Sequence, residues 1–168
     1  MPIGFVKNAS YEENPPRRQN MVYNANMVAR HHTLGTTFRN LEVGGAPDTR
    51  LQTIDTGVLG FDGFTRLIRT NRFASPSSPI PLASWQEAQL IIAEIEGGQA
   101  AVSAINTIRD AAGLPRFQSA DPAEIRAEVL EERRRVLFGT GHRIADLVES
   151  TLREELELHE VVVHVEPC

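Results

Sequence analysis

Histidines and carboxylates are the side chains of this sequence that could do chemistry. His142 and Asp146 stand four residues apart in a segment with a helical pattern, so both would project from one face of a helix. A zinc site needs at least three protein ligands, and no third ligand stands at a motif spacing. The adjacent His31 and His32 would point about 100° apart on a helix, too far to share a metal easily. We therefore expect no metal site and no cofactor.

Other catalytic arrangements are not recognisable either. There is no Gly-x-Ser-x-Gly turn and no phosphate-binding loop. The single cysteine, Cys168, is the last residue, which makes a thiol nucleophile improbable, and His159 and His164 stand in the tail without a known pattern. A small hydrolase that uses His142 or buried carboxylates is a third hypothesis, after the two binding functions given below, but no set of residues converges on one catalytic site. The prediction is that the chain is not an enzyme.

The charges argue against nucleic acid as a partner. Residues 1–83 hold nine basic and six acidic side chains, and residues 84–160 hold eight and fifteen. The arginines at 133–135 look like a phosphate-binding patch, but they stand among Glu128, Glu131 and Glu132. Side chains three and four apart pair on a helix surface, so we expect a solvated, ion-paired helix face there.

The first 83 residues are rich in turn-forming residues. Gly, Pro, Asn, Asp and Ser cluster at positions 14–16, 44–48, 60–63 and 75–79, which is typical of loops. One helix is plausible over residues 23–38. We treat residues 1–83 as a loop-rich segment of one domain. Its aromatic side chains could stack on sugar rings, and Phe61 and Phe64 are the candidate ligand contacts.

From residue 84 onward the pattern is helical. Ser84 with Glu87 forms a capping box, and Trp85, Ala88, Ile92 and Ile95 then recur on one face. This pattern predicts a first helix that ends at the glycines 97–98, and Trp85 is expected in the core. Glycine is favoured at helix C-termini, because it readily adopts the left-handed conformation.

Three more helices are expected in the same part of the chain. The second helix covers residues 99–112. The third begins at Asp121, with Pro122 at the first helical position, and the fourth begins near His142. Helix pairs that recur after about 38 residues resemble tetratricopeptide-like pairs. The prediction is an all-α fold of such pairs, with residues 84–160 as its helical part. Residues 161–168 are an atypical tail whose β-prone run has no identifiable partner strand.

The order of three motifs resembles the SusD/RagB-like family. Residues 79–94 read PIPLASWQEAQLIIAE, residues 101–109 and 112–115 read AVSAINTIR and AGLP, and residues 131–138 read EERRRVLF before GHR at 141–143 and DL at 146–147. Val136 and Thr140 replace glutamates that are usual in the last motif, and residues after Leu156 depart from the family. The resemblance implies a fragment of a SusD-like α-α superhelix, and it carries over no binding residue.

The resemblance also implies a function. SusD/RagB-like proteins are outer-membrane lipoproteins that face outward, bind glycans or other nutrients without catalysis, and hand them to a SusC-like TonB-dependent transporter. Neither a signal peptide nor a lipid-accepting cysteine is recognisable after Met1. The alternative prediction is a cytoplasmic helical-repeat module that binds other proteins. The sequence does not identify the nutrient or its contacts, and leaves open whether Met1 is the true start and whether the fragment folds alone.

Overall fold

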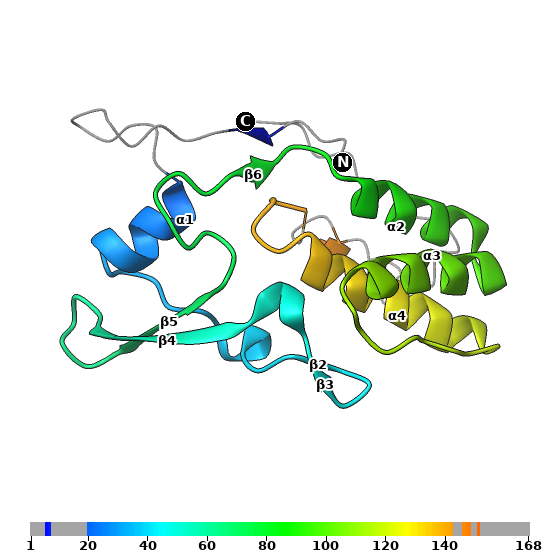
Figure 1. Cartoon of the computed structure of the whole chain (residues 1–168), viewed down its shortest axis with the longest axis horizontal. Helices are drawn as coiled ribbons and strands as arrows, with labels where there is room; N and C mark the ends of the chain where they lie inside the picture. The colour runs from blue at the N-terminus through cyan, green and yellow to red at the C-terminus, as the bar shows by residue number, and fades with distance from the viewer. Residues whose placement is uncertain (1–5, 8–19, 143–145, 149–150, 152–168) are drawn as a thin grey trace.

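The computed structural model describes residues 6–7, 20–142, 146–148 and 151. Within them, short antiparallel hairpins dominate the first half and three long helices the second (Figure 1). The expected all-α fold is therefore wrong, since the described residues form a mixed α/β structure. None of their helices has the length and apolar character needed to span a bilayer.

Helices α2 (Trp85–Glu96), α3 (Gly98–Ala111) and α4 (Pro122–Val136) lie side by side (Figure 1). Their starts and ends are locally encoded, as expected. The Ser84 side chain accepts a hydrogen bond from the Glu87 N–H (3.2 Å), and Asp121 accepts one from Ala123 (2.9 Å). Gly97 ends α2 with φ 62°, a conformation that glycine adopts without a Cβ penalty. The predicted helix boundaries in this region are confirmed to within one or two residues.

The core between these helices is built mainly from small and branched aliphatic side chains. It consists of Ala93, Ala101, Val102, Ala104, Ile105, Ile125 and Val129, with Phe117 packed against it. The predicted stripe of the first helix is partly wrong, because Ile92 and Ile95 are 41% and 79% exposed while Leu90 and Ala93 are buried. Trp85 is half-buried and not in this core. The face of α2 that meets its neighbours is thus rotated from the expected one.

The loop-rich half contains strands that the turn pattern concealed. Strand β4 (Thr53–Leu59) pairs antiparallel with β5 (Arg66–Thr70), and the register shifts between Asp55 and Leu59. Two shorter antiparallel pairs join β2 (Glu42–Val43) to β3 (Ala46–Pro47) and β1 (Val6–Lys7) to β6 (Ile80–Pro81). Val6 and Lys7 thereby lie beside the segment that leads into α2.

The single helix expected over residues 23–38 is wrong in form. In its place are α1 (Met21–Tyr23), the π-helical turn η1 (Asn24–Val28) and a separate 3₁₀ turn η2 (Thr36–Phe38). A further 3₁₀ turn, η3 (Thr49–Leu51), follows Asp48. Arg30 has φ 55°, a left-handed conformation that ends the helical path after η1. The fourth expected helix and the β-prone run at 161–165 lie largely or wholly outside the described residues.

Candidate functional site

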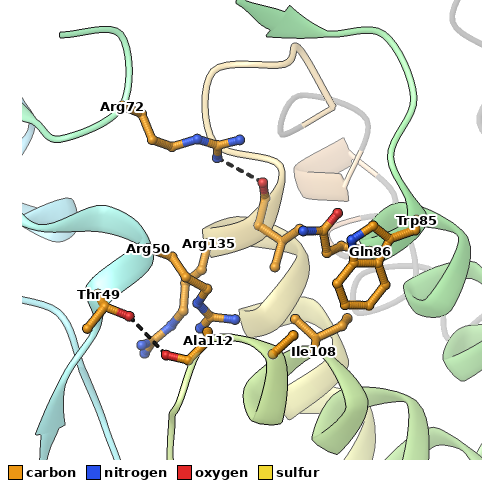
Figure 2. Close-up of a pocket in the computed structure, with 10 residues that line it drawn as sticks. Thr49, Arg50, Arg72, Trp85, Gln86, Ile108, Ala112 and Arg135 are labelled. Atoms are coloured by element: carbon orange, nitrogen blue, oxygen red, sulfur yellow. Dashed lines mark hydrogen bonds between the residues drawn. The ribbon is translucent and has the colours of Figure 1, made fainter. Parts of the chain in front are cut away.

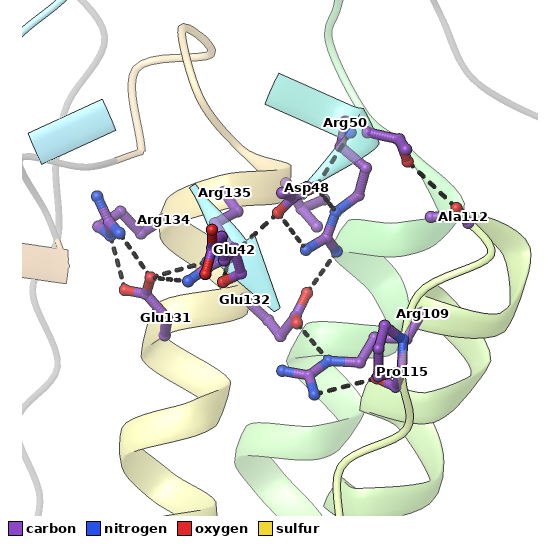
Figure 3. Close-up of polar contacts among 12 residues, drawn as sticks. Glu42, Asp48, Arg50, Arg109, Ala112, Pro115, Glu131, Glu132, Arg134 and Arg135 are labelled. Atoms are coloured by element: carbon purple, nitrogen blue, oxygen red, sulfur yellow. Dashed lines mark hydrogen bonds and ion pairs between the residues drawn. The ribbon is translucent and has the colours of Figure 1, made fainter. Parts of the chain in front are cut away.

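A buried chain of ion pairs joins the two halves of the molecule (Figure 3). Glu132 on α4 is fully buried, and its two oxygens accept hydrogen bonds from Arg50 Nη1 (2.6 Å) and Arg109 Nε (2.7 Å). Arg50 also pairs with the buried Asp48 through Nη2 (2.8 Å), and Arg109 pairs with Glu128. A buried carboxylate needs such partners, because an unpaired charge in the interior is very costly.

The arginines of α4 extend this network. Glu131 pairs with Arg134 (2.5 Å) and Arg135 (2.7 Å), which confirms the predicted pairing three and four residues apart on the helix. Arg135 reaches further and lies 3.2 Å from Asp48. The prediction of a solvated acidic face is wrong for Glu132, because its arginine partners come from η3 and α3 and enclose it.

Burial and ion pairing compete in setting the pKa values of this network. Burial alone would raise the pKa of Asp48, but the hydrogen bonds and charge of Arg50, joined by Arg135, outweigh it and hold the pKa below its ordinary value. At Glu128 the balance is reversed. Burial raises its pKa more than the charge of Arg109 lowers it. The network therefore holds Asp48 firmly ionised.

A cavity of about 630 Å³ opens beside this network (Figure 2). It lies where η3, the segment after β5, and the three long helices meet. Its walls combine arginine side chains with apolar ones: Thr49, Arg50, Arg72, Trp85, Gln86, Ile108, Ala111, Ala112, Arg135 and Val136. A volume of this size is typical of sites for small organic molecules. We call it the arginine cavity.

A second cavity, of about 540 Å³, lies between η1, η2 and the β5 strand. Its walls include the rings of Phe38, Phe73 and Phe138, and the Phe38 and Phe138 centroids are 4.9 Å apart. Gly139 allows Phe73 to approach, since a Cβ at position 139 would lie 2.5 Å from the Phe73 ring. This aromatic contact fixes the residues that follow α4 against the loop-rich half.

The two residues considered as a metal pair have other partners. His142 Nδ1 lies 3.3 Å from Glu87 Oε1, and Asp146 accepts a hydrogen bond from Arg133 Nη2 at 2.7 Å. Within the described residues, no three His, Cys, Asp or Glu side chains form a group that could hold a metal ion. His31 and His32 are exposed, while His159, His164 and Cys168 lie outside those residues.

Phe61 and Phe64, the predicted ligand contacts, lie in the turn between β4 and β5. Their side chains are 78% and 89% exposed, and Phe61 makes an edge contact with His31 at 5.7 Å between ring centroids. Neither lines either of the two cavities described above. Their role as ligand contacts stays a prediction. The arginine cavity was missed because its residues are far apart in the sequence and match no short motif.

Comparison with known proteins gives one partial match. A family model described as "Cation efflux protein, cytoplasmic domain" matches residues 138–168. No curated protein and no solved structure matches the chain. The family match covers less than a fifth of the sequence, from Phe138 after α4 to the last residue.

These comparisons correct the function expected from the sequence. The resemblance to SusD/RagB-like proteins is wrong, because the family model that matches is that of cation efflux proteins. The predicted glycan hand-over, the SusC-like transporter partner and the outward-facing lipoprotein location rested on that resemblance and are wrong with it. The matching description instead names a cytoplasmic domain of a cation-transport protein.

Proposed function

We propose that the chain binds divalent transition-metal cations through residues 138–168 and pairs there with a second copy of itself, as a cytoplasmic component related to cation efflux. The observation that carries this proposal is the family match over these residues. The binding needs no bond to be made or broken, so the chain acts without catalysis. This proposal replaces the earlier expectation that the sequence holds no metal site.

The side chains of the matched segment suit such a cation. His159 and His164 supply imidazoles, Glu160 and Glu166 supply carboxylates, and Cys168 supplies a thiol. Zn²⁺ prefers these nitrogen, oxygen and sulfur donors. His164 and Glu166 are two residues apart in the sequence, so their donor atoms are close along the chain.

The beginning of the matched segment is attached to both halves of the molecule. Phe138 packs against Phe38, and Asp146 pairs with Arg133 on α4. Asp146 is buried, so loss of Arg133 would leave its carboxylate uncompensated in the interior. These contacts support a link between cation binding in the segment and the packing of α4.

Calorimetric titration of the full chain with zinc chloride tests the proposal. We expect saturable binding. The affinity should fall by about tenfold or more in His164→Ala and in Glu166→Gln, because each ligand of a metal site contributes strongly to the binding free energy. His31→Ala is the matched control, since it also removes one imidazole but lies outside the matched segment. Its affinity should equal that of the natural sequence.

Two results would contradict the proposal. One is a titration without saturable heat at micromolar protein. The other is an equal loss of affinity in His31→Ala and His164→Ala, which would mean that zinc binds histidines without regard to the matched segment.

A further inference from the structure

The charges around the arginine cavity balance except at one residue. The acidic members of the network are Asp48, Glu128, Glu131 and Glu132, and their arginine partners are Arg50, Arg109, Arg134 and Arg135. Four negative charges thus meet four positive ones. Arg72 lines the same cavity, and among the described residues no carboxylate pairs with it. The cavity wall therefore carries one uncompensated cation.

The side-chain hydrogen bonds of Arg72 use only one of the three guanidinium nitrogens. Nη1 donates to the Val136 carbonyl (2.8 Å) and to the Phe138 carbonyl (3.2 Å), at the C-terminal end of α4. This capping contact accounts for the position of the side chain. It leaves Nε and Nη2 without a partner in the described residues. These two nitrogens form the side of the guanidinium that binds an oxyanion through two parallel hydrogen bonds.

The surroundings disfavour the charge that Arg72 carries. Burial and the nearby positive charge of Arg50 both lower its pKa. An anion at the Nε and Nη2 side would offset both effects. Arg50 and Arg135 also line the cavity, although their donors are already engaged by Asp48, Glu131 and Glu132.

From this geometry we propose that the arginine cavity binds a small organic carboxylate, with its carboxylate on Arg72 and a flat apolar group toward Trp85 and Ile108. Among the residues that line the cavity, Figure 2 shows Arg72 on one side, Trp85 and Gln86 on the other and Ile108 below them. The volume of about 630 Å³ exceeds what an inorganic ion would fill. No described residue of 138–168 lines this cavity, although Arg72 donates to the Phe138 carbonyl, and the site does not require the proposed cation binding.

The single tryptophan of the chain makes the test direct. Trp85 is the only tryptophan in the sequence and lines the cavity, so its fluorescence reports on occupation of this site. We would titrate the full chain with sodium benzoate, with benzamide as the neutral analogue of the same shape and inorganic phosphate as an anion without a ring. Benzoate should change the fluorescence saturably, and benzamide and phosphate should bind at least about tenfold more weakly.

Variants assign the effect to Arg72. Arg72→Gln should weaken benzoate binding by about tenfold or more, because it removes a charge-assisted, two-bond contact. Arg72→Lys retains a cation and a donor for the α4 carbonyls, but it lacks the planar guanidinium side that binds an oxyanion. It should therefore also bind benzoate weakly. This variant keeps the test valid if Arg72→Gln does not fold. Arg69→Gln is the matched control, because Arg69 carries the same charge, donates to Thr70 and does not line this cavity.

Three outcomes would overturn the inference. They are a fluorescence that does not respond to benzoate, equal responses to benzoate and benzamide, and full benzoate affinity in Arg72→Lys or Arg72→Gln.

Discussion

Arg50 Nη1 lies 2.6 Å from Glu132 Oε2, although the two residues are 82 positions apart in the sequence. The pair connects η3 in the loop-rich half to α4 in the helical half. Glu132 is completely buried, and its other oxygen is held by Arg109. The aliphatic core lies between α2, α3 and α4 alone, so charged contacts such as this one, together with the aromatic contact of Phe38 and Phe138, join the two halves.

Replacing Glu132 with alanine should destabilise the fold strongly. The change leaves Arg50 and Arg109 without their shared carboxylate, and breaking a buried ion pair costs about 3–5 kcal/mol. Urea unfolding followed by Trp85 fluorescence measures the free energy of unfolding. Glu94→Ala is the control, since Glu94 is more exposed and lies 3.4 Å from Arg133, and it should cost below about 1 kcal/mol. Equal costs for the two variants would contradict the role of Glu132.

Gly139 should tolerate alanine poorly for a reason that Gly141 does not share. Both have positive φ, at 75° and 95°, but only at Gly139 would a Cβ meet the Phe73 ring, at 2.5 Å. Phe73 is buried, so its ring cannot move without disturbing its neighbours. We expect Gly139→Ala to lose about 1–3 kcal/mol more than Gly141→Ala in thermal unfolding. The same melting temperature for both variants would show that the contact is not tight.

The stability of the protein should fall in acid because of Asp48. Its pKa is lower in the folded than in the unfolded chain, for which about 3.9 is usual. The stabilisation is therefore complete above about pH 4 and is lost as the pH falls through the lower, folded pKa. Urea unfolding between pH 6 and pH 2 should show this decline, with a shallower acid decline in Asp48→Asn. If the free energy of unfolding of Asp48→Asn falls in acid as steeply as that of the natural sequence, Asp48 is not the source of the decline.

The two exposed phenylalanines should matter little for stability. Phe64 is 89% exposed, and its replacement by alanine should change the free energy of unfolding by no more than about 0.5 kcal/mol. Phe61→Ala should cost slightly more, because it also removes the edge contact with His31. Thermal unfolding of both variants checks this. A loss above about 2 kcal/mol for Phe64→Ala would mean that the turn packs against something in the folded protein.

The sequence predicted those features that short stretches of chain determine by themselves. The helix starts at Ser84 and at Asp121 depend on side chains that cap backbone groups two or three residues away, so the pattern alone was sufficient. The end of α2 at Gly97 is equally local. Pairing within α4, from Glu131 to Arg134, follows from helical spacing and was predicted for the same reason.

Features that depend on distant partners could not be predicted in this way. Strand β4 is mostly exposed and alternates poorly, so its pairing with β5 leaves no clear period-two pattern. The burial of Glu132 depends on Arg50 and Arg109, and nothing near it in the sequence reveals them. The arginine cavity likewise combines residues from five segments. The function inferred from three short motifs was wrong, because the family model that matches the chain is that of cation efflux proteins.

The most direct test of the proposed function is the mass of the full chain in solution with and without zinc. The proposal predicts that sedimentation equilibrium gives the monomer mass of 18.6 kDa in the presence of a chelator and twice that mass with excess zinc. His164→Ala should remain monomeric under both conditions, whereas His31→Ala should pair as the natural sequence does. An unchanged mass on adding zinc to the natural sequence, or zinc-dependent pairing that survives in His164→Ala, would contradict the account.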